Sequence, residues 1–153
     1  MDAIFFVYGL SFMVLALIIL VQPKEESRHE LAEIIWLLIV FGFTHGMAEW
    51  LDLWTTVRGR TPALEIWKVS FLLVSFGFLF EFGRRLMLAT CVPALAHELL
   101  GKPIYGVVAL GFLLEFMMIP DPVLATDIAS RYFLGFAGST LTGIGFLLYF
   151  SKN

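Results

Sequence analysis

The chain alternates between long apolar stretches and short polar breaks, and this pattern predicts helices that cross a membrane. The first stretch, Ala3 to Val21, carries no charged residue, and a helix of that length spans a hydrocarbon core of about 30 Å. The segments "QPKEESRHE", "TTVRGRTP" and "PDP" interrupt the apolar sequence further along, and the prolines within them cannot continue a helix. We therefore predict five spans, over residues 3–22, 31–54, 63–85, 103–119 and 126–150.

We expect an all-α fold, a polytopic membrane helix bundle that forms a single transmembrane domain over residues 1–153. The sequence lacks the alternation of apolar and polar residues that marks membrane β-strands. The segment 86–102, "LMLATCVPALAHELLGK", is apolar but short, and Pro93 interrupts it. This segment either prolongs the third helix or lies along the membrane surface as an interfacial helix.

Composition supports the membrane class, since 59% of the residues are hydrophobic and 15% are charged, far from the balance of a soluble domain. The net charge of -3 gives no reason to expect a nucleic-acid partner. The single cysteine, Cys91, excludes an internal disulfide and a CxxC metal or redox motif. The start "MDAIFF" has an acid where a signal peptide would carry bases, so we expect the first span to remain in the mature protein.

Basic residues set the expected orientation, because cytoplasmic loops carry an excess of lysine and arginine. With the N-terminus outside, the cytoplasmic side receives six of them: Lys24, Arg28, Arg84, Arg85, Lys102 and Lys152. The outer side receives four: Arg58, Arg60, Lys68 and Arg131. We predict a protein of the bacterial inner membrane with its C-terminus in the cytoplasm.

The second span carries ionisable residues within its apolar sequence, in the stretch "FTHGMAEWLDLW". His45, Glu49 and Asp52 are spaced i, i+4 and i+7, so they share one face of the helix. At about 1.5 Å per residue, His45 lies about 21 Å above the start of the span near Leu31, in the outer half of the membrane. Ionisable residues within a bilayer are costly, and they usually face a bundle interior or a water-filled cavity.

Two later spans bring charged residues to the same depth. Glu115 lies about 18 Å above Pro103 on the fourth span, and Arg131 lies just below the outer surface on the fifth. A guanidinium can hold a carboxylate through two parallel hydrogen bonds, which predicts that Arg131 pairs with Glu115 or Glu49. We therefore expect a ligand-binding site formed by His45, Glu49, Glu115 and Arg131.

The imidazole of His45 leaves three roles open. With Glu49 it offers a nitrogen and an oxygen to one transition-metal ion, and Glu115 would complete the shell. A haem b at His45 would need a methionine as its second ligand, or an open position. The same residues suit proton-linked sensing or the binding of another small ligand, and the third role is a structural hydrogen bond.

The fifth span carries small residues at a regular spacing. Gly135, Ser139 and Gly143 recur at i+4, and small residues at this spacing let helix backbones approach closely. They serve either tight packing within the monomer or the contact of a homodimer. Because this helix is the last one and ends on the cytoplasmic side, it is also the natural element to transmit a signal.

Three stretches, "FTHGMAEWLDLW", "EFGRRL" and "DIASRYFLGFAGSTLTGIGFLLY", together resemble the multi-span N-terminal input regions of bacterial membrane sensor proteins. In such proteins the region precedes a cytoplasmic histidine kinase or diguanylate cyclase. The resemblance implies a sensor that binds a small ligand, cofactor or ion and signals through its last helix to such an output domain, as in two-component systems. The chain ends at "YFSKN", so an excised input module and a stand-alone subunit both remain open.

The sequence offers no sign of an enzyme, since it lacks H-E-x-x-H, a P-loop and a Ser-His-Asp arrangement placed for catalysis. Two other functions compete with the sensor. The first is a small membrane cytochrome or electron-transfer subunit. The second is a structural or assembly subunit of a membrane complex.

Overall fold

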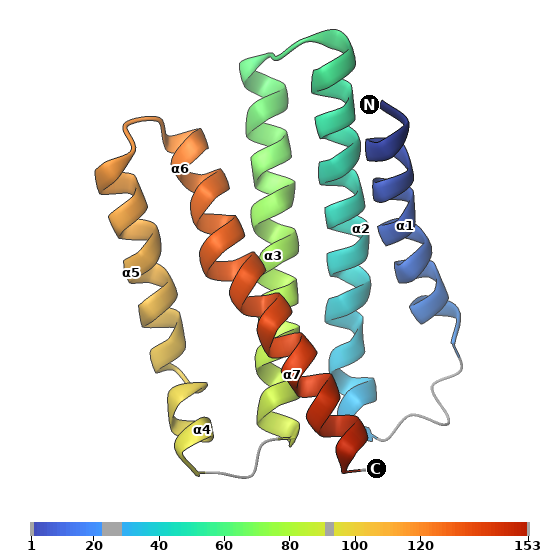
Figure 1. The fold of residues 1–153 in the computed structure, drawn as a ribbon, viewed down its shortest axis with the longest axis vertical. Coiled ribbons are helices and arrows are strands. Elements are labelled where there is room, and N and C mark those ends of the chain that lie inside the picture. The colour runs from blue at the N-terminus through green and yellow to red at the C-terminus, as the bar shows by residue number, and fades with distance from the viewer. Residues whose placement is uncertain (1, 23–28, 91–93, 153) are drawn as a thin grey trace.

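The computed structural model describes residues 2–22, 29–90 and 94–152, and every regular element in these ranges is a helix (Figure 1). This confirms the predicted all-α fold. The elements are α1 (Asp2–Val21), α2 (His29–Arg58), α3 (Pro62–Thr90), α4 (Ala94–Leu99), α5 (Pro103–Met118), α6 (Pro122–Ala129), the π-helix η2 (Ser130–Phe136) and α7 (Ala137–Ser151).

Four helical stretches are long and apolar enough to cross a membrane. They are Ala3–Val21, Leu31–Arg58, Pro62–Thr90 and Pro122–Ser151, the last formed by α6, η2 and α7 in one continuous run. Pro103–Met118 is apolar but has only 16 residues, fewer than the ~20 that a typical span needs. The predicted count of five spans is therefore not confirmed, and the chain is a membrane protein with four candidate spans.

The helices α1, α2 and α3 stand side by side in chain order, and the run of α6, η2 and α7 crosses α3 obliquely (Figure 1). Helix α5 packs against α6, on the side away from α2. The start of α1, the α2–α3 connection and the α5–α6 connection lie at one end of the bundle, which we call the N-terminal end. Helix α4 and the end of α7 lie at the other, the C-terminal end (Figure 1).

The segment 86–102 divides between two helices. Its first residues prolong α3, which continues to Thr90, and a separate short helix α4 begins at Ala94. Cys91 and Pro93 lie outside the described residues. The prolonged third helix is thus confirmed for the first residues of the segment, and the interfacial position of the short helix that follows stays a prediction.

Glycines bring α1 close to α2. A Cβ atom at Gly42 would lie 2.8 Å from the carbonyl oxygen of Phe12, and one at Gly46 would lie 2.9 Å from the oxygen of Gly9. Real Cβ atoms do not approach backbone this closely, so the two helices can pack at this distance only with glycine at both positions. The spacing G-x-x-x-G places both contacts on the face of α2 next to α1.

A second close contact joins α3 to α7, and it uses different small residues from those predicted. A Cβ atom at Gly138 would lie 2.7 Å from the backbone nitrogen of Phe80, and one at Gly83 would lie 2.7 Å from the oxygen of Gly138. By contrast, a Cβ atom at Gly143 would meet nothing within 4 Å, and Ser139 is exposed. Of the predicted stripe, Gly135 packs within the monomer beside the Phe76 ring, whereas Ser139 and Gly143 are exposed, and their alternative role in a homodimer contact stays a prediction.

A charged network ties α3 to α5 near the C-terminal end. Arg84 donates two hydrogen bonds to the Glu81 carboxylate, at 2.8 and 2.9 Å, and Arg85 donates a third at 2.6 Å. The Tyr105 hydroxyl donates to the same carboxylate at 2.6 Å, and Arg84 also donates to the Leu100 oxygen at 3.1 Å. This network fixes the start of α5 against α3.

Candidate functional site

A cleft of about 530 Å³ opens between α1, α2, α3 and the η2–α7 run. Ligand sites in proteins usually have volumes of about 300–1,000 Å³. The residues that line the cleft are Tyr8, Phe12, Phe41, His45, Glu49, Phe76, Leu79, Arg131, Gly135, Phe136 and Ser139. Three of the four predicted site residues, His45, Glu49 and Arg131, therefore meet in one cavity.

Aromatic rings from three helices surround the imidazole of His45, which is only 5% exposed. The ring centroid of Phe12 lies 4.4 Å away, that of Phe76 5.1 Å, that of Phe41 5.2 Å and that of Tyr8 6.5 Å. These rings come from α1, α2 and α3. The polar contacts of the imidazole are made by its two ring nitrogens. The sequence placed His45 on a polar face, and the structure adds an aromatic enclosure around it.

Hydrogen bonds determine which ring nitrogen of His45 faces the cleft. The Nδ1 atom lies 3.1 Å from the Ser75 hydroxyl oxygen, and that hydroxyl donates its proton to the Leu72 carbonyl at 2.8 Å. With that single proton on the Leu72 carbonyl, Ser75 accepts from Nδ1–H of His45, and we assign this tautomer from the hydrogen-bond pattern. In the neutral imidazole, the lone pair is then on Nε2.

The Nε2 atom of His45 faces the carboxylate of Glu49 one turn along α2. The distance from Nε2 to the Glu49 Oε1 atom is 3.6 Å, which exceeds the length of a hydrogen bond. Two acceptor atoms therefore face each other across a short gap. A group that donates hydrogen bonds, or a proton, would satisfy both.

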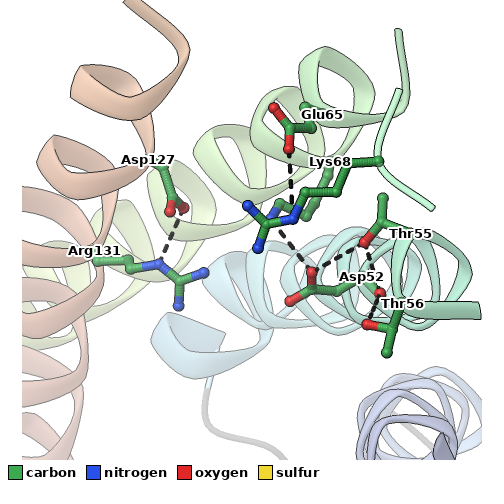
Figure 2. A network of polar contacts seen from close by, with 8 residues as sticks. Asp52, Thr55, Thr56, Glu65, Lys68, Asp127 and Arg131 are labelled. Carbon is green, nitrogen blue, oxygen red and sulfur yellow. Dashed lines mark hydrogen bonds and ion pairs between the residues drawn. The ribbon is translucent and has the colours of Figure 1, made fainter. Parts of the chain in front are cut away.

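Arg131 reaches the same cleft from the π-helix η2. Its Nε atom donates to the Asp127 carboxylate at 3.0 Å, within the same helical run, and its side chain is 49% exposed (Figure 2). The predicted pairing of Arg131 with Glu115 or Glu49 is thus wrong within the described residues, where Asp127 is its ion-pair partner. Arg131 therefore contributes a guanidinium to the lining of the cleft while it is paired with Asp127.

Glu115 does not line the cleft. It lies half-buried on α5, which packs against α6 and η2 rather than α2, with Gly111 against the Phe133 ring. Depth along the bundle placed Glu115 at the right height, but the helix carrying it stands on the far side of α6 (Figure 1). The predicted metal-ligand shell of His45, Glu49 and Glu115 is therefore not brought together in one place.

The described part of the chain offers few side chains that could together bind a metal ion. No group of three or more histidine, cysteine, aspartate or glutamate side chains is close enough there to hold one. The lining of the cleft includes one histidine and neither methionine nor cysteine, so a haem at His45 would lack a second ligand from the cleft walls. Of the three predicted roles of His45, the structure shows the hydrogen bond, which joins it to Ser75, and the binding of a metal, a haem or another small ligand stays a prediction.

Asp52 belongs to a separate polar layer nearer the N-terminal end. Its carboxylate lies 3.3 Å from the Lys68 ammonium on α3 and 3.4 Å from the Thr55 hydroxyl (Figure 2). In the same layer the guanidinium of Arg60 lies 3.8 Å from the Glu65 carboxylate. The ionisable groups at this level therefore form separate ion pairs. Asp52 pairs with Lys68, outside the His45 cleft.

Sequence reasoning missed Ser75 and the aromatic residues that enclose His45. Ser75 was visible as a polar residue in the apolar stretch "FLLVSFGF", and its 30-residue separation from His45 gave no sign of the contact. Phe12, Phe41 and Phe76 are three of 16 phenylalanines, so composition could not distinguish them from lipid-facing residues.

No protein-family model matches the chain, and neither a curated protein nor a solved structure matches it. The function is therefore inferred from the cleft itself.

Proposed function

We propose that the chain is a membrane-embedded sensory input module, without catalytic activity of its own, that binds a small molecule in the His45 cleft. The observation that carries this proposal is the cleft of about 530 Å³ in which His45, Glu49 and Arg131 meet. Such a concentration of polar groups in apolar helices is costly, and it usually marks a functional site. A purely structural role for these groups would not require a cavity beside them.

The last helical run connects the cleft to the C-terminal end. Arg131, Gly135 and Phe136 belong to η2 and line the cleft, and α7 continues from η2 without a break. A π-helix is less regular than an α-helix and is often found at functional sites. A ligand that contacts η2 can therefore change its winding and shift α7 against α3.

A switch of this kind needs a ligand that binds one packing of α7 more tightly than the other. The contact between α7 and α3 includes a close backbone approach at Gly138 and Gly83. At its end, the Lys152 ammonium donates to the Thr90 carbonyl. A shift of α7 would break this last contact and present a different helix end to a partner.

The proposed location is the bacterial inner membrane, with the N-terminal end outside and the C-terminal end in the cytoplasm. The charge bias supports this orientation, because Arg84, Arg85, Lys102 and Lys152 lie towards the C-terminal end. There α7 would meet a histidine kinase or diguanylate cyclase output domain. Gly143 is exposed and a Cβ atom there would meet nothing within 4 Å, so a homodimer would use this edge of α7.

The test is to identify, without a prior candidate, the molecules that co-purify with the protein from its native membrane. The chain is purified in native-lipid nanodiscs, and bound organic molecules and metals are identified by mass spectrometry, together with an absorption spectrum. We expect one organic molecule to be enriched over empty nanodiscs and depleted in His45→Ala and Glu49→Gln. Glu115→Gln is the matched control, because the same chemical change then lies outside the cleft.

Two outcomes would contradict the sensor proposal. A Soret band that disappears in His45→Ala would favour the membrane cytochrome. The absence of any enriched molecule or metal, with all three variants unchanged, would favour the structural or assembly subunit.

A further inference from the structure

The polar groups of the cleft restrict the chemistry of its ligand. Nε2 of His45 and the Glu49 carboxylate lie 3.6 Å apart as two acceptors, so the ligand must donate a hydrogen bond there. Arg131 lines the same cleft, and a guanidinium has only donors, so the ligand must also accept one. A hydroxyl group on each side of the ligand would meet both requirements.

The charges of the cleft favour a neutral ligand. A carboxylate ligand such as a fatty acid would meet the carboxylate of Glu49, which lines the cleft. A cationic ligand would meet the guanidinium of Arg131. Since a charged molecule of either sign faces one group of like charge, a neutral molecule with hydroxyl groups is bound with the least electrostatic cost.

The walls of the cleft favour a flat ring. Phe12, Phe76 and Tyr8 line it, and aromatic rings attract one another in offset or edge-to-face contacts. On the rim, Tyr8 is 48% exposed and Phe136 70% exposed. Both belong to stretches that are candidate membrane spans, so the rim faces lipid and the ligand would enter from the bilayer.

We infer that the cleft binds the head group of a lipid-soluble hydroquinone, an inference that rests on the proposed function of the cleft as a small-molecule site. One phenolic hydroxyl donates to Nε2 of His45 or to Glu49, and the opposite oxygen accepts from Arg131. The apolar tail leaves between Tyr8 and Phe136 into the bilayer. The oxidised quinone lacks the donating hydroxyl, so the site discriminates the two redox forms by binding alone.

This inference predicts that the protein reports the reduction state of the membrane quinone pool. A missing hydrogen bond to the paired acceptors weakens binding of the quinone by about three- to tenfold relative to the hydroquinone. Glu49→Gln replaces the carboxylate by an amide, a weaker acceptor that also donates, so this variant should bind the hydroquinone more weakly and with a smaller preference over the quinone. His45→Ala, which keeps Glu49 as an acceptor, should reduce the preference as well.

The test uses the full chain in nanodiscs with a photoreactive benzoquinol as the label. Decylubiquinol and decylubiquinone compete separately for labelling under anaerobic conditions, and the labelled peptides are mapped by mass spectrometry. We expect labels on the cleft residues of α1, α2 or η2, and decylubiquinol to compete three- to tenfold better in the wild type and in Glu115→Gln. Equal competition by both forms in the wild type, or labelling spread over the lipid-facing surface, would overturn the inference.

The outcomes also separate this inference from the proposed function. If the purified protein carries a different molecule whose occupancy depends on Glu49, the hydroquinone is wrong and the sensory site stands. If the cleft carries nothing and excludes decylubiquinol, both are wrong. Folding of the variants is checked by their thermal unfolding, and Glu49→Gln, which preserves side-chain shape, serves if His45→Ala does not fold.

Discussion

The Nδ1 atom of His45 on α2 lies 3.1 Å from the hydroxyl oxygen of Ser75 on α3, and both side chains are buried. This single contact crosses between the two longest helices of the bundle and orients the imidazole. Because the Ser75 hydroxyl donates to Leu72, it can only accept from His45, and the lone pair of Nε2 is directed towards Glu49. The chemistry of the cleft depends on that orientation.

Replacing Ser75 by alanine should therefore remove the hydrogen bond that favours one tautomer of the His45 imidazole. In the wild type, ¹⁵N NMR of the labelled imidazole should show a protonated Nδ1 and an unprotonated Nε2. Ser75→Ala should give a mixture of both tautomers, and the free energy of unfolding should fall by about 1–3 kcal/mol because a buried donor loses its partner. Ser70→Ala is the matched control, since Ser70 is exposed on the same helix and donates to the Ile66 carbonyl. An unchanged imidazole spectrum in Ser75→Ala would show that this contact does not orient the ring.

The contact between α3 and α7 predicts opposite effects for two glycines of the same helix. An alanine at Gly138 would place its Cβ atom 2.7 Å from the backbone nitrogen of Phe80, and backbone cannot easily move aside. We expect Gly138→Ala to lower the free energy of unfolding by about 1–3 kcal/mol. Gly143→Ala should be neutral or stabilising by up to about 1 kcal/mol, because alanine favours a helix and meets nothing within 4 Å there. Thermal unfolding in the same detergent measures both, and equal effects would contradict the assigned packing face.

The contact between α1 and α2 can be tested in the same way. An alanine at Gly42 would place its Cβ atom 2.8 Å from the Phe12 carbonyl and 2.9 Å from the Ala16 Cβ, so α1 must move outwards. Since α1 carries Phe12 and Tyr8 of the cleft, Gly42→Ala should weaken ligand binding as well as stability, by about 1–3 kcal/mol for the latter. Gly77→Ala, where a Cβ atom meets nothing within 4 Å, should leave ligand binding unchanged and be neutral or stabilising by up to about 1 kcal/mol. A Gly42→Ala protein with normal stability and ligand content would contradict the close approach of α1.

The network around Glu81 predicts a local effect at the C-terminal end. Glu81 accepts from Arg84, Arg85 and Tyr105, and its replacement by alanine leaves Arg84 without its carboxylate. We expect hydrogen–deuterium exchange in α5 to become faster in Glu81→Ala, while exchange in α1 and α2 around His45 stays the same. Glu98→Ala, an exposed change on α4, provides the comparison. Faster exchange throughout the bundle would show that Glu81 stabilises the whole fold rather than the position of α5.

Apolar patterning was sufficient to predict the helices, because a bilayer forces each long apolar stretch into one. The predicted count of five spans is not confirmed, since Pro103–Met118 is apolar but short. Rise per residue gave the depth of each ionisable group, and His45, Glu49 and Arg131 do meet. Depth gives no information about the side of the bundle, and for this reason Glu115 was misplaced.

Local irregularity was the other feature that could not be predicted. The π-helix at Ser130–Phe136 widens the turn and redirects the residues that follow, so a regular i+4 stripe drawn from Gly135 fails at Gly143. Gly138 instead faces α3. The Phe76 ring of α3 lies beside Gly135 within this segment, and such a contact between two helices is not revealed by the pattern of one helix.

The central claim is that occupancy of the His45 cleft moves the last helix, and a distance measurement tests it most directly. Spin labels are placed in a Cys91→Ser background at Glu33 on α2 and Ser151 on α7, both exposed near the C-terminal end. Distances are measured by pulsed electron paramagnetic resonance in the protein as purified from its membrane. We predict two populations of distance in the wild type and in Glu115→Gln, and loss of one of them in Glu49→Gln. A single distribution shared by all three proteins would contradict the account.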